Sequence, residues 1–142
     1  MLKILVPVDG SANALRAVQH VIDQRDWYQG PLELHLLNVQ LPVASGVVKS
    51  FIKQSQLNDY YRDEGLAALK PAREALESAG LACQHHIGVG EPARTILDYA
   101  ADKQCQLLVM GTHGRGAFAG ALLGSVAAKV VHAAPVPVLL VR

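Results

Sequence analysis

Glycine, serine and arginine gather in one segment, which joins the apolar run 106–110 to an amphipathic stretch. The residues concerned are Gly111, Gly114, Arg115, Gly124 and Ser125. Glycine lets backbone N–H groups approach a ligand closely and also adopts positive φ. A helix N-terminus adds unpaired N–H groups and a partial positive charge. This spacing favours phosphate binding; the alternative is a turn whose glycines serve tight packing.

Two better-known phosphate-binding motifs are excluded by residue type. Gly116 is followed by Ala-Phe, whereas a P-loop continues with Lys and then Ser or Thr. A dinucleotide fingerprint would require glycine at position 119, which is alanine. That fingerprint also follows the first strand of its fold, whereas this loop follows the fourth predicted strand.

A carboxylate follows the first apolar run of the chain, 2–8. Asp9 comes directly after that run, and Ser11 stands two residues later. A carboxylate there can accept hydrogen bonds from ribose hydroxyls or from the adenine amine. Asp is also a helix-capping residue, so a cap for the following helix is the alternative. Ser11 is itself the predicted N-cap of that helix.

Apolar runs alternate with amphipathic segments along the chain. Strands are predicted at 2–8, 32–39, 81–89, 106–110 and 135–141, and helices at 12–24, 58–78, from 92 onward, and from 124–125 to 132. Strands that are apolar on both faces suit a parallel sheet. The strand–helix alternation predicts one α/β domain over 1–142, a doubly wound sheet with helices on both faces. Ligands of such sheets bind at the carboxyl ends of the strands.

Two stretches are harder to interpret. Residues 40–57 contain Pro42, Ser45 and Gly46, so we expect a long connection there, with a flap as one possibility. Pro71 lies inside the predicted helix 58–78 and should kink or split it.

Composition narrows the class of protein. Of 142 residues, 51% are hydrophobic and 18% charged, which excludes a disordered chain. A formal charge of +1 excludes binding to nucleic acid by net charge alone. The longest mostly apolar stretch, 116–128, is too short to span a bilayer, so no membrane association is expected. Two cysteines without tight spacing favour reduced thiols and a cytoplasmic location.

Four segments together resemble the universal stress protein family. They are Gly-x2-Gly-x9-Gly-Ser at 111–125, ILVPVDGS at 4–11, VGEPA at 89–93 and PVPVLLV at 135–141. The resemblance covers nearly the whole chain and weakens over 40–57. Some members of the family lack the glycine signature, and this chain keeps it, so the resemblance indicates the ATP-binding class.

The resemblance implies a strand order 3-2-1-4-5, ATP in a cleft at the strand ends, and a homodimer. It places the phosphates and ribose at Gly111, Gly114, Gly124 and Ser125, with Arg115 and Val126 nearby. It places the adenosine along Pro7, Val8, Asp9 and Val39, with Met110 beside the ribose and base. It identifies no catalytic residue and no metal ligand in the protein.

The function that we expect is that of a regulatory stress-response protein. It would bind ATP, or else AMP or ADP, with Mg²⁺ or Mn²⁺ bridging the phosphates, and would act as a nucleotide-dependent homodimeric switch toward an unidentified protein partner. The apolar segment Val136–Val141 is the expected dimer contact if it forms an edge strand. The alternatives are a slow ATP-hydrolysing enzyme of the same fold and a dimerisation module with an empty cleft.

Other polar side chains give weaker signals. Cys83 and His85 share one face of a predicted strand and His86 points to the other, so no metal cluster is expected. Lys129 is expected either near a phosphate or on a solvated helix face. Tyr60 and Tyr61 are expected on a helix surface or at the dimer contact.

Overall fold

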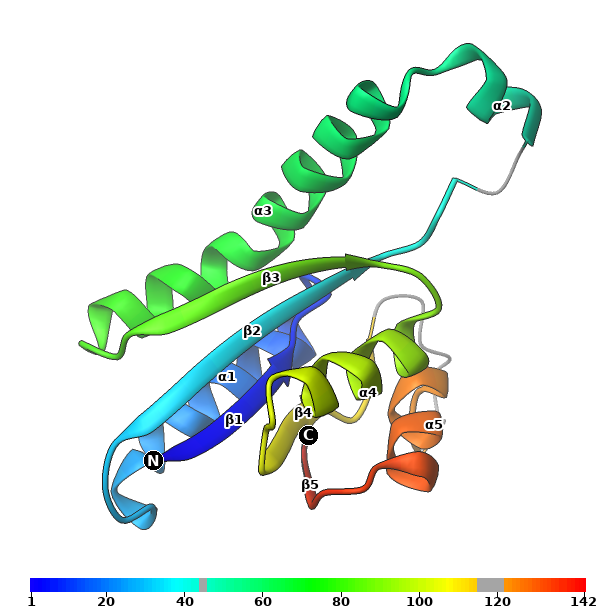
Figure 1. Cartoon of the computed structure of the whole chain (residues 1–142). Helices are drawn as coiled ribbons and strands as arrows, with labels where there is room; N and C mark the ends of the chain where they lie inside the picture. Colours follow the sequence, from blue (N-terminus) through cyan, green and yellow to red (C-terminus); the bar gives the residue numbers. More distant parts are fainter. Residues whose placement is uncertain (44–45, 115–121) are drawn as a thin grey trace.

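A computed structural model describes residues 1–43, 46–114 and 122–142. In these residues five strands form one parallel sheet in the order β3-β2-β1-β4-β5, as expected (Figure 1). The strands are β1 (Leu2–Pro7), β2 (Leu32–Gln40), β3 (Cys83–Val89), β4 (Leu107–Gly111) and β5 (Val138–Val141). The predicted α/β class and the strand order are therefore confirmed.

Helices cover both faces of the sheet (Figure 1). They are α1 (Ala12–Asp23), α2 (Gly46–Phe51), α3 (Gln54–Ser78), α4 (Pro92–Asp102) and α5 (Ser125–Ala133), with a short 3₁₀ turn η1 at Arg25–Trp27. Helices α1 and α3 pack against one face, whereas α4 and α5 pack against the other. In the described part of the chain, no helix combines the length and the apolar character needed to cross a membrane.

Alternation along the strands divides the core into two layers. In β1, Ile4 and Val6 pack with α1 and α3, whereas Leu5 between them packs with α4 and α5. All three side chains are buried. Strands that bury both faces must be apolar throughout, which is why β1 and β4 are recognisable in the sequence as continuous apolar runs.

The described residues of the stretch 40–57 are more regular than we expected. It holds α2, and α3 begins at Gln54 rather than near residue 58. The side chain of Gln56 accepts a hydrogen bond from the backbone N–H of Lys53 at 3.0 Å and so closes the start of α3. This start is hard to recognise because Lys53, the N-cap residue, is not one of the usual capping residues.

Pro71 does not split α3, and β5 is shorter than we predicted. Pro71 neither splits nor ends α3, which runs unbroken from Gln54 to Ser78 and buries Leu69 and Leu76 around it. Strand β5 begins at Val138 rather than at residue 135. Pro137 can still accept a bond from the N–H of Leu108 at 3.0 Å, but it has no N–H to donate.

Candidate functional site

A cavity of about 480 Å³ lies at the carboxyl ends of β1, β2 and β4. Its wall contains every described residue of the predicted site, namely Pro7, Val8, Asp9, Val39, Met110, Gly111, Gly114, Gly124, Ser125 and Val126. Arg115 lies outside the described residues. Small-molecule sites are commonly about 300–1,000 Å³, so this cavity has a suitable size.

The three signature glycines lie close to other parts of the chain. A Cβ atom on Gly111 would overlap the side-chain oxygen of Asn13, and one on Gly114 would overlap a carboxylate oxygen of Asp9. A Cβ atom on Gly124 would lie 3.2 Å from Cα of His113. None of the three has positive φ, so close approach, rather than backbone freedom, is what requires glycine here. Tight packing therefore accounts for part of the signature.

Asp9 lies between the first turn and the glycine segment. Its Oδ1 accepts the N–H of Ser11 at 2.9 Å, while Oδ2 faces Gly114. The cap of α1 is Ser11, whose Oγ accepts the N–H of Ala14 at 3.1 Å. Since Ser11 performs the capping, the carboxylate of Asp9 is positioned as part of the cavity wall.

The start of α5 forms another part of the wall. Gly124 is its N-cap, and in the described part of the chain no side chain caps this end. Ser125, Val126 and Ala127 of the first turn all line the cavity. The first N–H groups of a helix lack partners within the helix and carry partial positive charge. This end of α5 thus offers the cavity an anion-binding group.

Lys129 projects from α5 toward the start of α4 rather than lying alone in solvent. Its Nζ is 3.7 Å from Oε1 of Glu91, and 64% of its side chain is exposed. Glu91 caps α4 by accepting the N–H groups of Arg94 and Ala93 at 2.8 and 3.2 Å. These backbone bonds, chiefly the one from Arg94, lower the pKa of Glu91, and Lys129 adds to the effect.

Two asparagines behind the wall were not identified from the sequence. Asn38 is only 2% exposed and donates to the carbonyl of Val8 at 2.8 Å, which fixes the end of β1 against β2. Asn13 accepts the N–H of His113 at 2.9 Å. The available signal for Asn38 was its place on the inward face of a strand, in register with leucines. Asn13 carried no comparable signal.

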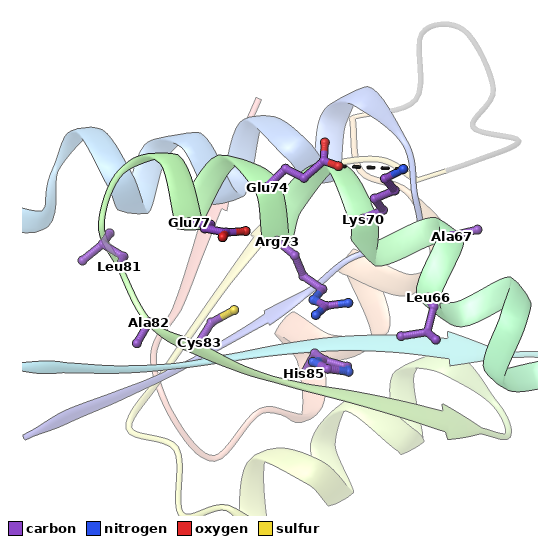
Figure 2. A pocket seen from close by; sticks show the side chains of 10 residues that line it. All are labelled: Leu66, Ala67, Lys70, Arg73, Glu74, Glu77, Leu81, Ala82, Cys83 and His85. Atoms are coloured by element: carbon purple, nitrogen blue, oxygen red, sulfur yellow. Dashed lines mark ion pairs between the residues drawn. The ribbon is translucent and has the colours of Figure 1, made fainter.

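A second cavity, of about 600 Å³, lies between α3 and β3 (Figure 2). Its lining includes charged side chains from α3, such as Arg73, together with Cys83 and His85 from β3. It borders the amino-terminal half of β3, whereas ligands of doubly wound sheets bind beyond the carboxyl ends. We therefore assign the candidate site to the smaller cavity.

The remaining polar residues of the sequence analysis include Cys83, His85 and His86 of β3. Cys83 and His85 do share the α3 face, and His86 does point to the other side, where it contacts His35. Burial raises the pKa of both thiols, Cys83 and Cys105. In the described residues no group of three or more His, Cys, Asp or Glu side chains could hold a metal ion.

The two neighbouring tyrosines of α3 differ in environment. Tyr60 is exposed, as expected, but Tyr61 is buried, which corrects the prediction of a surface position. The hydroxyl of Tyr61 accepts the N–H of Val43 at 2.9 Å, so this side chain ties α3 to the segment after β2.

Comparison with known proteins identifies the family. The model of the universal stress protein family matches residues 1–142. The chain is 33% identical over 141 residues to the universal stress protein MJ0531 of Methanocaldococcus jannaschii, with 99% of this chain and 81% of that protein covered. This chain belongs to the universal stress protein family.

Solved structures agree with this assignment. The structure of MJ0577 from Methanocaldococcus jannaschii has a TM-score of 0.84 and 30% identity, covering 99% of this chain and 94% of the other. A universal stress protein in complex with cAMP has a TM-score of 0.70 and 26% identity, covering 99% and 97%. More distant members of the fold have been solved with AMP, from Arabidopsis thaliana, and with dAMP, from Archaeoglobus fulgidus.

Proposed function

We propose that this protein belongs to the ATP-binding class of its family and acts as a nucleotide-dependent stress-response regulator. The observation that carries the proposal is the convergence of all the described signature residues on one cavity. The start of α5, which no side chain of the described residues caps, lies in its wall. Relatives that bind cAMP, AMP and dAMP support an adenine nucleotide as the ligand.

The proposed arrangement follows the chemistry of the wall. Gly111, Gly114, Gly124 and Ser125 hold the phosphates through backbone N–H groups and the serine hydroxyl, with Arg115 and Val126 nearby. The apolar residues Pro7, Val8, Val39 and Met110 contact the adenosine. Asp9 accepts from the ribose hydroxyls or the adenine amine. Mg²⁺ or Mn²⁺ bound with the nucleotide would reduce the repulsion between its phosphates and Asp9.

The proposal includes a homodimer formed through β5. This strand pairs with β4 and stands at one end of the sheet order, and its residues Val138 to Val141 are only half-buried. An apolar edge strand is a natural site for pairing with a second copy. Nucleotide binding would then alter the affinity of this dimer for a protein partner in the cytoplasm. Light scattering that shows a monomer would overturn the dimer.

A second candidate function is a dimerisation module with an empty cleft. The tight packing of Gly111, Gly114 and Gly124 favours it, because these glycines would be needed even without a ligand. Slow ATP hydrolysis remains a third candidate, with Asp9 as its sole acidic group in the described wall. Neither candidate accounts for the place of the α5 N-terminus in the cavity wall as directly as phosphate binding does.

Calorimetric titration of Mg-ATP into nucleotide-free protein tests the proposal. We expect about one site per chain, and we expect Gly124→Asp to weaken ATP binding at least about tenfold, because it places a negative charge beside the phosphates. Gly124→Ala is the matched control, since its Cβ meets the same neighbours, 3.2 Å from Cα of His113, without the charge.

Three outcomes are decisive. ATP binding by wild type and by Gly124→Ala, but not by Gly124→Asp, supports the site. Equal binding by all three proteins would contradict the phosphate position. Absence of binding in folded wild-type protein would favour the dimerisation module.

A further inference from the structure

One side chain of α1 supports the glycine segment from behind. Oδ1 of Asn13 accepts the backbone N–H of His113 at 2.9 Å, across 100 positions in the sequence. Asn13 is half-buried and does not line the cavity, whereas His113 and Gly114 do. The bond therefore reaches the wall from its outer side.

The fit between Asn13 and Gly111 is close. A Cβ atom on Gly111 would lie 2.8 Å from Cγ and 3.0 Å from the backbone oxygen of Asn13, besides overlapping Oδ1. Since Gly111 ends β4, the missing side chain at 111 creates the space through which Asn13 reaches His113. The missing side chain of this signature glycine thus makes room for the asparagine, while its backbone remains part of the cavity wall.

Backbone bonds fix Thr112, the residue before His113. The N–H of Thr112 donates to the carbonyl of Val141 at 3.0 Å, and the carbonyl of Thr112 accepts the N–H of Gly124 at 2.7 Å. That carbonyl and the N–H of His113 belong to one peptide group, so Asn13 holds the second polar atom of the peptide that leads to His113 and Gly114 in the wall. A ligand held by backbone N–H groups requires these peptides to be oriented before it binds.

We infer that Asn13 is a positioning residue for phosphate recognition, acting through His113 and Gly114 without touching the nucleotide. This inference rests on the proposed function. It applies to the phosphate end of the cavity alone, because most residues assigned to the adenosine lie at the ends of β1 and β2, where the hydrogen bond from Asn38 to the carbonyl of Val8 holds the two strands together. Loss of the Asn13 side chain should therefore weaken ATP binding and leave adenosine binding nearly unaffected.

The test compares two substitutions of similar shape. Asn13→Leu removes the acceptor, and Asn13→Asp keeps it. We expect Asn13→Leu to weaken the binding of Mg-ATP about tenfold, which is the usual effect of losing one hydrogen bond. The affinity for adenosine should change less than about twofold. Asn13→Asp should keep the amide of His113 protected from hydrogen exchange, and any loss of ATP affinity should shrink with added salt. Gln19→Leu, on the exposed side of the same helix, is the control and should change neither affinity.

The outcomes separate the two proposals. If wild type binds ATP and Asn13→Leu binds it equally well, the positioning role is wrong and the proposed function stands. Equal losses for ATP and adenosine would show a general structural role and would also overturn the inference. If wild type binds neither ligand, both proposals fail. If Asn13→Leu does not fold, Asn13→Ser replaces it. Loss of hydrogen-exchange protection at the His113 amide, at unchanged adenosine affinity, then supports the inference.

Discussion

The two faces of the sheet differ in the side chains that are buried on them. The core under α1 and α3 is formed by aliphatic side chains and alanine, including Ile4, Val6, Leu36 and Leu69. The core under α4 and α5 is also largely apolar, but a histidine, His35, is buried on this side with only 2% exposure. The first layer holds one buried amide, Asn38, whereas the second holds a titratable side chain.

Three side chains form a connected polar chain on the α4 side. Nε2 of His35 lies 2.7 Å from Oε1 of Glu33, and Nδ1 of His35 lies 2.9 Å from Nε2 of His86. A carboxylate accepts, so His35 donates through Nε2 and, when both rings are neutral, accepts through Nδ1 from His86. The rings are stacked, with centroids 5.2 Å apart, and His86 also packs against Tyr99 at 5.7 Å.

The largest effect should come from the apolar layer. Leu69 is fully buried between α3 and the sheet, so Leu69→Ala should lower the free energy of unfolding by about 2–5 kcal/mol through lost burial and a residual cavity. Leu66→Ala, one turn earlier and only half-buried, is the control. Urea denaturation measures both. A cost for Leu69→Ala no greater than that of its control would show that this layer can collapse around the gap.

Removal of His35 should have an intermediate effect. His35→Leu keeps an apolar body of similar size but leaves Glu33 and His86 without their partner, and we expect a cost of about 1–2 kcal/mol. The cost stays below that of Leu69→Ala because Glu33 and His86 are only half-buried and can turn to water. A neutral or stabilising result in urea denaturation would show that the polar chain contributes nothing to this layer.

The same contrast explains what could be predicted from the sequence. Strands β1 and β4 and the glycine segment are recognisable because each depends on local residue types. The pairings His35–His86 and Asn13–His113 depend on register and on the approach of distant elements, across 51 and 100 positions. No local pattern contains them. The start of α3 was predicted wrongly for another reason. Its polar first turns are closed by Gln56 rather than by a usual capping residue.

The described residues of the predicted site line one cavity because the sheet topology brings them together. The carboxyl ends of parallel strands meet at one edge, so residues following β1, β2 and β4 converge whatever their side chains are. Which glycine faces a ligand and which faces the chain is a finer question. The structure shows that the Cβ position of Gly111 faces Asn13 and that of Gly114 faces Asp9.

The smallest effect, and the sharpest test of the comparison, is the response to pH. Burial lowers the pKa of His86 below its ordinary value of 6.5, and electrostatic interactions with His35, Lys103 and His85 lower it further. The unfolded chain therefore binds a proton more readily than the folded chain, so stability should fall as the pH drops through about 6.5. The hydrogen bond from His35 lowers the pKa of Glu33 below 4.5, which adds a second loss at more acidic pH, below that value.

Adjacent histidines on opposite faces provide the control for this prediction. His86→Leu removes the titrating group from the polar chain on the α4 side. The urea midpoint should therefore change less between about pH 7.5 and 5.5 than in wild type. His85→Leu, on the exposed α3 side of the same strand, should leave that pH dependence in place. If the two variants respond alike, acid sensitivity belongs to the molecule as a whole. If only His86→Leu flattens the curve, the sensitivity lies in the layer that holds the polar chain.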